Sequence, residues 1–392
     1  MKPLAHITVV ALEQAVAAPF ATRQLADLGA RVIKIERPDG GDFARGYDSS
    51  VNGLSSYFVW LNRSKESLTL DLKRQAARDV LARLLERADV FVQNLAPGAV
   101  DRLGMAPPEL RSRHPRLIVC NVSGYGPTGP YANRKAYDLL VQSEAGLLAI
   151  TGTAGAPAKA GISVADIAAG MYAYSGILTA LIARSTTGSG STVDVSLFDA
   201  LAEWMGFAAY YTAYGGSAPV PSGAHHSSIA PYGPFRAGDG GVVYLAVQNA
   251  REWTRFCAEV IERADLTDDP RFATNALRVR HRDGLHAAID AAFADRSTHD
   301  VIRRLERAGI AYARLNSVQD LIDHPQLSAR NRWRGIGSPV GPVRALVPPV
   351  DIDGVEPCMG DVPALGQHTN AILEGLGVDR ATIASWREEG TI

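Results

Sequence analysis

The sequence predicts an α/β fold, with a Rossmann-like parallel sheet in a large domain and a second, smaller α/β domain. Two observations support this prediction. Short β-branched runs alternate with helical segments up to Val122, which is typical of βαβ units and of a parallel sheet covered on both faces. A stretch rich in Gly, Pro, Ser and His, residues 215–240, then interrupts the pattern. At 392 residues the chain is long enough for two domains.

The first part of the chain supplies the predicted sheet. Strands are expected at residues 7–12 and 31–36, in runs ending at Asn94 and Val122, and at the start of residues 192–205. Helices are expected at residues 17–29, 74–87 and 108–113, over an uncharged segment from Ile167 to Ala183, and at the end of residues 192–205. These elements place the large domain at residues 1–215.

The second part of the chain predicts the smaller domain, at residues 225–325. It opens with a strand at residues 242–247, followed by helices at 252–261, 278–294 and 298–308. Residues 333–352 read as an extended, Pro-rich segment, and helices at 369–376 and 380–389 close the chain. Residues 330–392 therefore form a third, C-terminal part.

Composition excludes several classes of function. Forty basic and 41 acidic residues give a net charge of −1, so neither a nucleic acid nor an anionic membrane is attracted by the chain as a whole. The three cysteines are widely scattered, which supports neither a disulfide framework nor a zinc site. The uncharged segment after Asp166 nearly reaches membrane-spanning length, but its glycines, tyrosines and hydroxyl residues favour a protein core. We expect a cytoplasmic protein with no metal.

A dinucleotide-binding protein is the natural alternative for such a sheet. After the first strand the chain reads EQAVAAP and has no G-x-G-x-x-G fingerprint, which argues against a nicotinamide or flavin site. Tyr131 and Lys135 have the Y-x-x-x-K spacing of short-chain reductases, but without a glycine-rich turn we interpret this match as chance.

Basic residues follow several of the predicted strands. Arg37, Lys73, Arg102 and Lys135 each stand shortly after a strand or in the loop beyond it. Each alone is most simply a solvated surface charge. Because parallel strands present their carboxyl ends at one edge of the sheet, the set predicts a site for a ligand with several phosphates.

Asp166 is the last ionisable residue before the uncharged helix. Ser163 and Asp166 form the S-x-x-D pattern of a capping box, with Ser163 as N-cap and Asp166 at the third helical position. The simplest interpretation is therefore a structural cap. The functional interpretation is that the backbone N–H groups keep the carboxylate ionised, as a nucleophile requires, and serve as oxyanion donors.

With these features placed, the sequence resembles the class III coenzyme A transferases, which include formyl-CoA transferase and carnitine CoA-transferase. The resemblance covers essentially the whole chain. Its markers are AAPFATRQLADLGARVIKIERPDGGD, NRSKESLTLDLK, NLAPGAVDRLG, SGYGPTGPY, KAYDLLVQSEAG and ADIAAGMYAYSGILTAL. It implies an interlocked homodimer in which residues 330–392 return to the large domain. It also implies coenzyme A and acyl-CoA as substrates, with no permanently bound cofactor.

Carried over by matching motif, the resemblance implies that Asp166 is the nucleophile. It also implies a set of coenzyme A contacts, which fall on Val16, Ala17, Arg37, Leu70, Asp71, Leu72, Lys73, Asn94, Leu95, Ala96, Arg102, Lys135, Ala136, Tyr137 and Asp138. Formyl-CoA transferase has a Glu where this chain has Asp138, and a run of four glycines that has no counterpart here. That difference puts formate or oxalate as the substrate in doubt.

The racemase branch of the family, which includes α-methylacyl-CoA racemase, is an alternative. Racemases have a His in the place of Tyr137, and this chain reads KAYD, so a transferase is favoured. Within the family, the chain most resembles enzymes that use succinyl-CoA and short dicarboxylates of the itaconate, mesaconate, citramalate or malate type. The segments that carry this resemblance are AAPFATRQLADLGARVIKIERPDGGDFARGYD, SGYGPTGPY and PYGPF. His226 and Arg23 are candidates for the distal carboxylate. Transfer between the two carboxyl groups of mesaconyl-CoA and a non-catalytic CoA-binding protein remain as alternatives.

Overall fold

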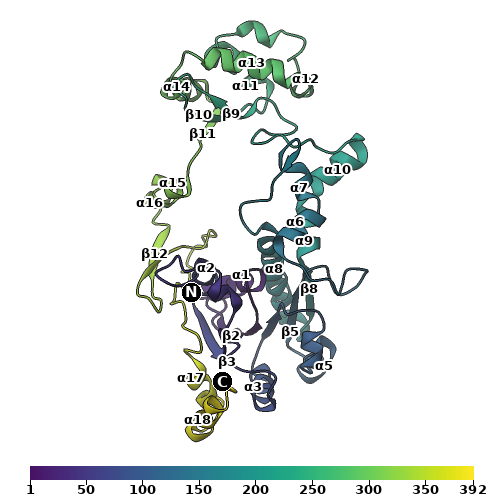
Figure 1. Ribbon diagram of the computed structural model, residues 1–392, viewed down its shortest axis with the longest axis vertical. Helices are drawn as coiled ribbons and strands as arrows, with labels where there is room; N and C mark the ends of the chain where they lie inside the picture. Colours follow the sequence, from purple (N-terminus) through teal and green to yellow (C-terminus); the bar gives the residue numbers. More distant parts are fainter. The chain divides into compact units, whose positions relative to one another are not determined.

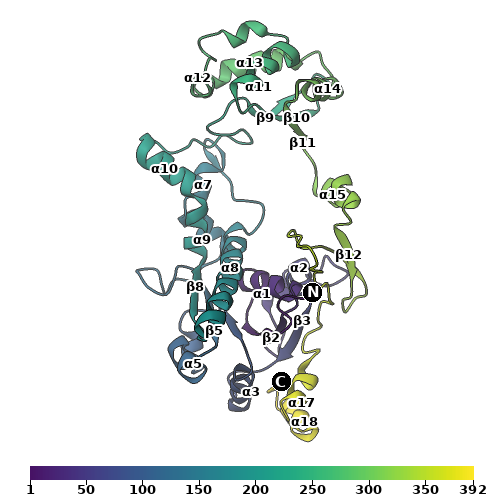
Figure 2. The ribbon, with the colours of Figure 1, turned by 180° about the vertical axis from the view of Figure 1, so that it is seen from behind.

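The computed structural model describes residues 1–392 and separates into two units. Unit 1 consists of Met1–Ala145, Ala160–Met205 and Gln326–Ile392, and unit 2 of Gly146–Lys159 and Gly206–Pro325. Residues 146–159 and 206–215, which the sequence placed in the large domain, thus belong to unit 2. One reason is a β-bridge between Thr153 and Ser222 within that unit. Figures 1 and 2 show both units.

A six-stranded parallel sheet forms the centre of unit 1. Its strand order is β3-β2-β1-β4-β5-β8, and all five pairings are parallel. The strands are β1 (Thr8–Leu12), β2 (Arg31–Glu36), β3 (Lys65–Thr69), β4 (Val90–Gln93), β5 (Ile118–Ser123) and β8 (Thr192–Ser196). The order reverses at β1, as in doubly wound nucleotide-binding sheets, so ligands are expected at the carboxyl ends of the strands near β1.

Helices cover both faces of this sheet (Figure 1). Alternate strand residues such as Val10, Ile33 and Phe91 join one buried cluster with residues of α3 (Gln75–Leu85), α5 (Pro107–Arg113), α17 (Thr369–Gly375) and α18 (Arg380–Glu388). On the other face lie α1 (Ala17–Asp27) and α8 (Val164–Thr187), which pack against each other. By length and composition α8 is apolar enough to span a membrane, yet it packs on α1, on α9 (Leu197–Trp204) and on the sheet.

Shorter elements complete unit 1. They are the 3₁₀ turn η1 (Phe43–Gly46), α2 (Ser56–Asn62), α4 (Ala99–Arg102), α6 (Asp138–Glu144), α16 (Pro325–Ala329) at the unit boundary, and the antiparallel hairpin of β12 (Trp333–Ile336) and β13 (Val343–Leu346). The sequence predicted the hairpin only as an extended segment. It predicted neither α2 nor α6.

Unit 2 has its own core and an antiparallel sheet of order β11-β10-β9. Its elements are β6 (Gly152–Thr153), β7 (Ala156–Pro157), β9 (Tyr232–Arg236), β10 (Val242–Ala246), β11 (Ala311–Arg314), α7 (Leu147–Ile150), α10 (Gly206–Gly215), α11 (Ala250–Arg255), α12 (Asn275–Arg280), α13 (Arg282–Phe293), α14 (Thr298–Ala308), α15 (Val318–Ile322), and the 3₁₀ turn η3 (Ala264–Thr267). The helix predicted at 252–261 continues past Arg255 as a wider π turn, η2 (Phe256–Val260). Strand β9 lies within residues 215–240, which the sequence indicated only as an interruption of the strand and helix pattern.

Candidate active site

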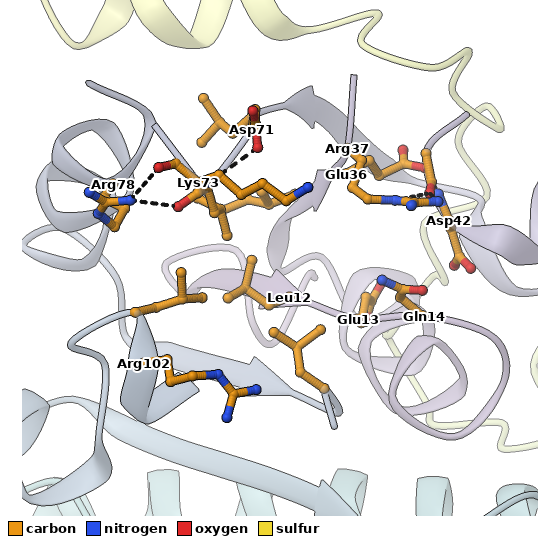
Figure 3. A pocket seen from close by; sticks show the side chains of 16 residues that line it. Leu12, Glu13, Gln14, Glu36, Arg37, Asp42, Asp71, Lys73, Arg78 and Arg102 are labelled. Atoms are coloured by element: carbon orange, nitrogen blue, oxygen red, sulfur yellow. Dashed lines mark hydrogen bonds between the residues drawn. The ribbon is translucent and has the colours of Figure 1, made fainter. Parts of the chain in front are cut away.

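A cavity of about 500 Å³ opens in unit 1 beside the carboxyl ends of β1, β2 and β3 (Figure 3). Its walls come from Leu12 at the end of β1, from Glu36 and Arg37 at the end of β2, and from the loop after β3. Seven residues that the sequence assigned to coenzyme A line it, namely Arg37, Leu70, Asp71, Leu72, Lys73, Leu95 and Arg102. The cavity therefore lies where the reversal of strand order predicts a ligand.

Four basic side chains surround the cavity. Arg78, which the sequence did not single out, donates hydrogen bonds to the carbonyl oxygens of Leu72, at 3.0 Å, and Lys73, at 2.8 Å, and so fixes the loop after β3. The Arg37 guanidinium lies near the carbonyl oxygen of Gly41. The side chains of Lys73 and Arg102 form no hydrogen bond or ion pair within the chain. Two cations are therefore available to phosphate groups.

Beneath the cavity lies a network of buried charges. The Lys34 ammonium is 2.8 Å from an Asp42 carboxylate oxygen and 3.5 Å from Glu13, and all three side chains are fully buried. The ammonium of Lys65 lies 2.7 Å from the same Glu13 carboxylate. Burial lowers the pKa of Lys65 to about 8, against the attraction of Glu13. Because Glu13 and Asp42 also line the cavity, the network forms its floor.

The network and Asn94 hold the turn between β1 and α1. Asp42 accepts a hydrogen bond from the backbone N–H of Ala15, which has a left-handed φ of 62°, a conformation that costs energy for a residue with a Cβ. Asn94 donates to the carbonyl of Gln14 and accepts from its N–H, both at 2.8 Å. Of the predicted coenzyme A contacts, Asn94, Ala96, Val16 and Ala17 do not line the cavity.

Asp166 occupies the third position of α8, as predicted, and Ser163 is the N-cap residue. The predicted capping box is absent, because the Ser163 side chain makes no capping hydrogen bond. Oδ1 of Asp138 instead accepts from the backbone N–H groups of Ala165, at 2.8 Å, and Asp166, at 3.3 Å. Asp138 thus caps α8 from the start of α6 and, like Lys135, Ala136 and Tyr137, does not line the cavity.

The expectation that helix N–H groups keep Asp166 ionised is therefore wrong. Its partly buried carboxylate accepts no hydrogen bond from them, and burial together with the negative charge of Asp138 raises its pKa to about 7. The predicted oxyanion donors are also engaged. Besides the two N–H groups bound by Asp138, those of Val164 and Ile167 donate to the carbonyls of Ile162 and Ser163.

Tyr47 is a neighbour of Asp166 that the sequence did not reveal. Burial raises the pKa of this phenol to about 12, with further contributions from the charges of Asp42 and Asp166 and from Tyr137. Tyr47 is 48% exposed and packs edge-to-face on Tyr57. The one sequence signal that could have identified Tyr47 is its position in GDFARGYD, which continues one of the family markers.

The two candidates for the distal carboxylate each have other partners within their own unit. Arg23 on α1 is buried, and its guanidinium lies 2.8 Å from the Asp27 carboxylate, which the Arg63 guanidinium also contacts at 2.8 Å. A single carboxylate is thus shared between two guanidiniums. His226 belongs to unit 2, where its ring stacks on Tyr232 and its Nδ1 accepts from the N–H of Ser228 at 3.2 Å. Neither contact identifies a carboxylate site.

Comparison with known proteins gives one consistent result. Residues 4–369 match the model of CoA-transferase family III. The chain is 33% identical to succinyl-CoA:glutarate CoA-transferase of Mus musculus, over 100% of this chain and 91% of that protein. It is 36% identical to acetyl-CoA:oxalate CoA-transferase of Acetobacter aceti, over 87% and 89%. It is 30% identical to succinyl-CoA:mesaconate CoA-transferase of Haloarcula marismortui, over 97% and 98%.

The same agreement holds for structure. A CAIB/BAIF family protein from Brucella suis superposes with a TM-score of 0.83 at 32% identity, covering 96% of this chain and 99% of that one. The predicted α/β fold with its six-stranded parallel sheet is thereby confirmed.

Proposed function

The chain belongs to CoA-transferase family III, and from that premise we propose that it moves coenzyme A from succinyl-CoA to a short dicarboxylic acid, with Asp166 as the nucleophile. The proposed acceptors are of the itaconate, mesaconate, citramalate or malate type. Relatives that act on succinyl-CoA with glutarate or mesaconate support this substrate class, whereas the relative that acts on oxalate broadens it.

The proposed reaction begins with attack of the Asp166 carboxylate on the thioester carbonyl. The C–S bond breaks, and a mixed anhydride and the coenzyme A thiolate result. The thiolate then attacks the aspartyl carbonyl, which releases succinate and leaves an aspartyl-CoA thioester. The acceptor carboxylate repeats both steps in reverse, and Asp166 is regenerated. A carboxylate suits this role because an anhydride retains the group-transfer potential that an oxygen ester would lose.

One observation supports Asp166 above all. Its carboxylate stands at the start of a long helix, partly buried, without a hydrogen bond and with a pKa raised to about 7. Structural carboxylates of this chain, such as Glu36, are instead paired, and the Arg45 and Lys34 cations outweigh burial and lower the pKa of Glu36 to about 2. A carboxylate with a pKa near the working pH is both substantially ionised and more basic than an ordinary one.

Oligomeric state and location belong to the same proposal. We expect an interlocked homodimer in the cytoplasm. Large exposed apolar side chains, among them Trp204 at 49% and Phe207 at 54%, are consistent with surfaces that a second copy covers. Light scattering that finds a stable monomer would contradict the dimer.

The decisive experiment traps the covalent intermediate. The protein is incubated with succinyl-CoA alone, quenched, and analysed as intact protein and as peptides. We expect a mass increase corresponding to coenzyme A on the peptide that contains Asp166, and its conversion by hydroxylamine to a hydroxamate. Label from free succinate should exchange into succinyl-CoA. A non-catalytic CoA-binding protein would give neither result.

An acceptor panel tests the substrate class. Itaconate, mesaconate, citramalate, malate, glutarate and oxalate are compared with acetate and butyrate, with succinyl-CoA as donor. A preference for monocarboxylates would remove the dicarboxylate assignment. Mesaconyl-CoA and a chiral 2-methylacyl-CoA, each supplied without an acceptor, test the intramolecular transferase and the racemase.

The free cations of the cavity give a further prediction. Replacing Arg102 with glutamine is expected to raise KM for succinyl-CoA about tenfold and to leave kcat nearly unchanged, because a phosphate contact remote from the reacting atoms binds substrate and transition state equally. Added salt should weaken this difference. The matched control is Arg87→Gln, since Arg87 is exposed in the turn after α3, does not line the cavity and donates to the Gly375 carbonyl at 3.2 Å. Equal KM values for the two variants would contradict phosphate binding in this cavity.

A further inference from the structure

Both carboxylate oxygens of Asp138 accept hydrogen bonds from groups of unit 1. Its Oδ1 accepts from the first turn of α8, as described above, and its Oδ2 accepts from the side-chain amide of Gln142 at 2.7 Å. Gln142 is fully buried, and its Oε1 accepts from the N–H of Ala160 at 2.9 Å. This arrangement ties the start of α6 to the start of α8 and fixes the Asp138 carboxylate against the residue that precedes Asp166.

The hydrogen bonds of Asp138 to α8 affect Asp166, because Asp166 lies in the first turn of that helix. An aspartate in the first turn of a helix ordinarily folds back to accept from unpaired N–H groups there, which lowers its pKa and its basicity. Those groups are saturated here, because Asp138 takes two of them and backbone carbonyls take the neighbouring two. Ser163 contributes nothing. The Asp166 carboxylate thus has no local partner to hold it against the helix.

We propose that Asp138 is a positioning residue for the transfer reaction: it occupies the N-terminal N–H groups of α8 and thereby leaves the Asp166 carboxylate without a local hydrogen bond and free to attack a thioester. This inference rests on the proposed function. It assigns Asp138 a role in addition to the coenzyme A contact that the family resemblance implies.

The charge of Asp138 adds to its geometry. Burial and then the Asp138 carboxylate raise the pKa of Asp166. On α1, Arg23 shares the Asp27 carboxylate with Arg63, and on α6, Glu144 pairs with Arg134.

The neighbouring strands and α9 add no opposing cation. Asp194 on β8 accepts from Asn121 and Asp199 on α9 accepts from Ser196. Cys120 on β5 is buried, which raises its pKa to about 12, and Glu203 on α9 is exposed. Asp138 is the one charged group that shifts the pKa of Asp166, and no cation opposes it.

Two substitutions separate geometry from charge. Asp138→Asn retains a side-chain oxygen that can accept from α8 and removes the charge, whereas Asp138→Ala removes both. The control is Glu144→Gln, which removes an exposed carboxylate from the same helix. The rate of aspartyl-CoA formation from succinyl-CoA is measured in a single turnover from pH 5 to pH 9, together with the thermal midpoint.

For Asp138→Asn we expect the midpoint of the pH–rate profile to move at least one pH unit lower, with a plateau rate within about tenfold of the unmodified protein. For Asp138→Ala we expect the same displacement and a plateau about 10- to 100-fold lower, because Asp166 then caps its own helix. Glu144→Gln should match the unmodified protein.

Other outcomes overturn the inference. A lower thermal midpoint with an unchanged pH profile in both Asp138 variants would mean a purely structural cap. Unchanged rates and profiles in both variants would mean no role at all. If the unmodified protein itself forms no adduct on Asp166, both the proposed function and this inference are wrong. If the adduct forms with the same rate and pH dependence in both Asp138 variants, only this inference is wrong.

Discussion

Replacing Asp166 with asparagine is expected to lower the rate of coenzyme A transfer by roughly 10⁴-fold or more, the scale on which enzymes lose activity without their covalent nucleophile. Asparagine has nearly the same shape, so substrate binding should persist. The measurements are steady-state transfer from succinyl-CoA, the exchange of labelled succinate, and the adduct mass. Substantial exchange activity in Asp166→Asn would rule out the assigned nucleophile.

The same variant provides its own folding control. The pKa of Asp166 is raised, by burial first and Asp138 second, from an ordinary 3.8 to about 7. The folded state therefore holds a proton that the unfolded state releases above pH 4, so stability falls as the pH rises from about 4 to 7 and the loss persists above 7. Asp166→Asn removes this cost. Its free energy of unfolding should exceed that of the unmodified protein at pH 8, by at most about 4 kcal/mol, and should equal it near pH 4.

If the Asp166→Asn variant is instead less stable than the unmodified protein at pH 8, the folded state stabilises the charged form of Asp166. Loss of activity would then have to be separated from loss of structure. Chemical denaturation at pH 4 and at pH 8 measures this difference directly.

Much of unit 1 was predictable because most residues of β1 to β5 are buried. Runs such as ITVVAL and LIVCNV permit few alternatives to a parallel strand, and the basic residues after two strands and in a third loop proved to share one cavity. The grouping of Arg37, Lys73 and Arg102 could be predicted from the sequence, because parallel strands place their carboxyl ends, and the loops that follow them, at one edge of the sheet.

The details of the site were not predictable in the same way. S-x-x-D is a local signal, but the cap of α8 comes from Asp138, which is 27 residues before Ala165 in the sequence. A tertiary contact thus replaced the local one. Strand β9 was missed because Gly233 and Pro234 interrupt its pattern. The burial of Lys34 and Lys65 was not predicted either, because nothing local in the sequence reveals that Glu13 and Asp42 pair with them.

This buried network leads to the second large expected effect. Replacing Lys34 with methionine should lower the free energy of unfolding by about 3–5 kcal/mol, because it leaves the Asp42 and Glu13 carboxylates buried with Lys65 as their remaining ammonium partner. Burial opposes the charge on Lys34, but Asp42, Glu13 and Glu36 outweigh it and raise the pKa of Lys34. Urea denaturation at neutral pH measures the loss.

The matched control lies on the same strand. Arg31 on β2 pairs with Glu66 at 2.8 Å, but its side chain is 51% exposed. An exposed pair contributes at most about 1 kcal/mol, so Arg31→Met should cost far less than Lys34→Met. A cost of less than 1 kcal/mol for Lys34→Met would show that water or relaxation compensates the buried carboxylates.

The double variant Lys34→Met/Asp42→Asn separates the fold from the site. Removing both charges should restore part of the stability lost in Lys34→Met, because the uncompensated carboxylate is gone. Asparagine can still accept from the N–H of Ala15, as Asp42 does at 3.0 Å, so the strained turn beside the cavity should persist. If Lys34→Met raises the KM for succinyl-CoA and the double variant lowers it again together with the regained stability, the buried charges act on the site by holding that turn in place. If stability returns and KM does not, the charge of Lys34 itself contributes to the cavity.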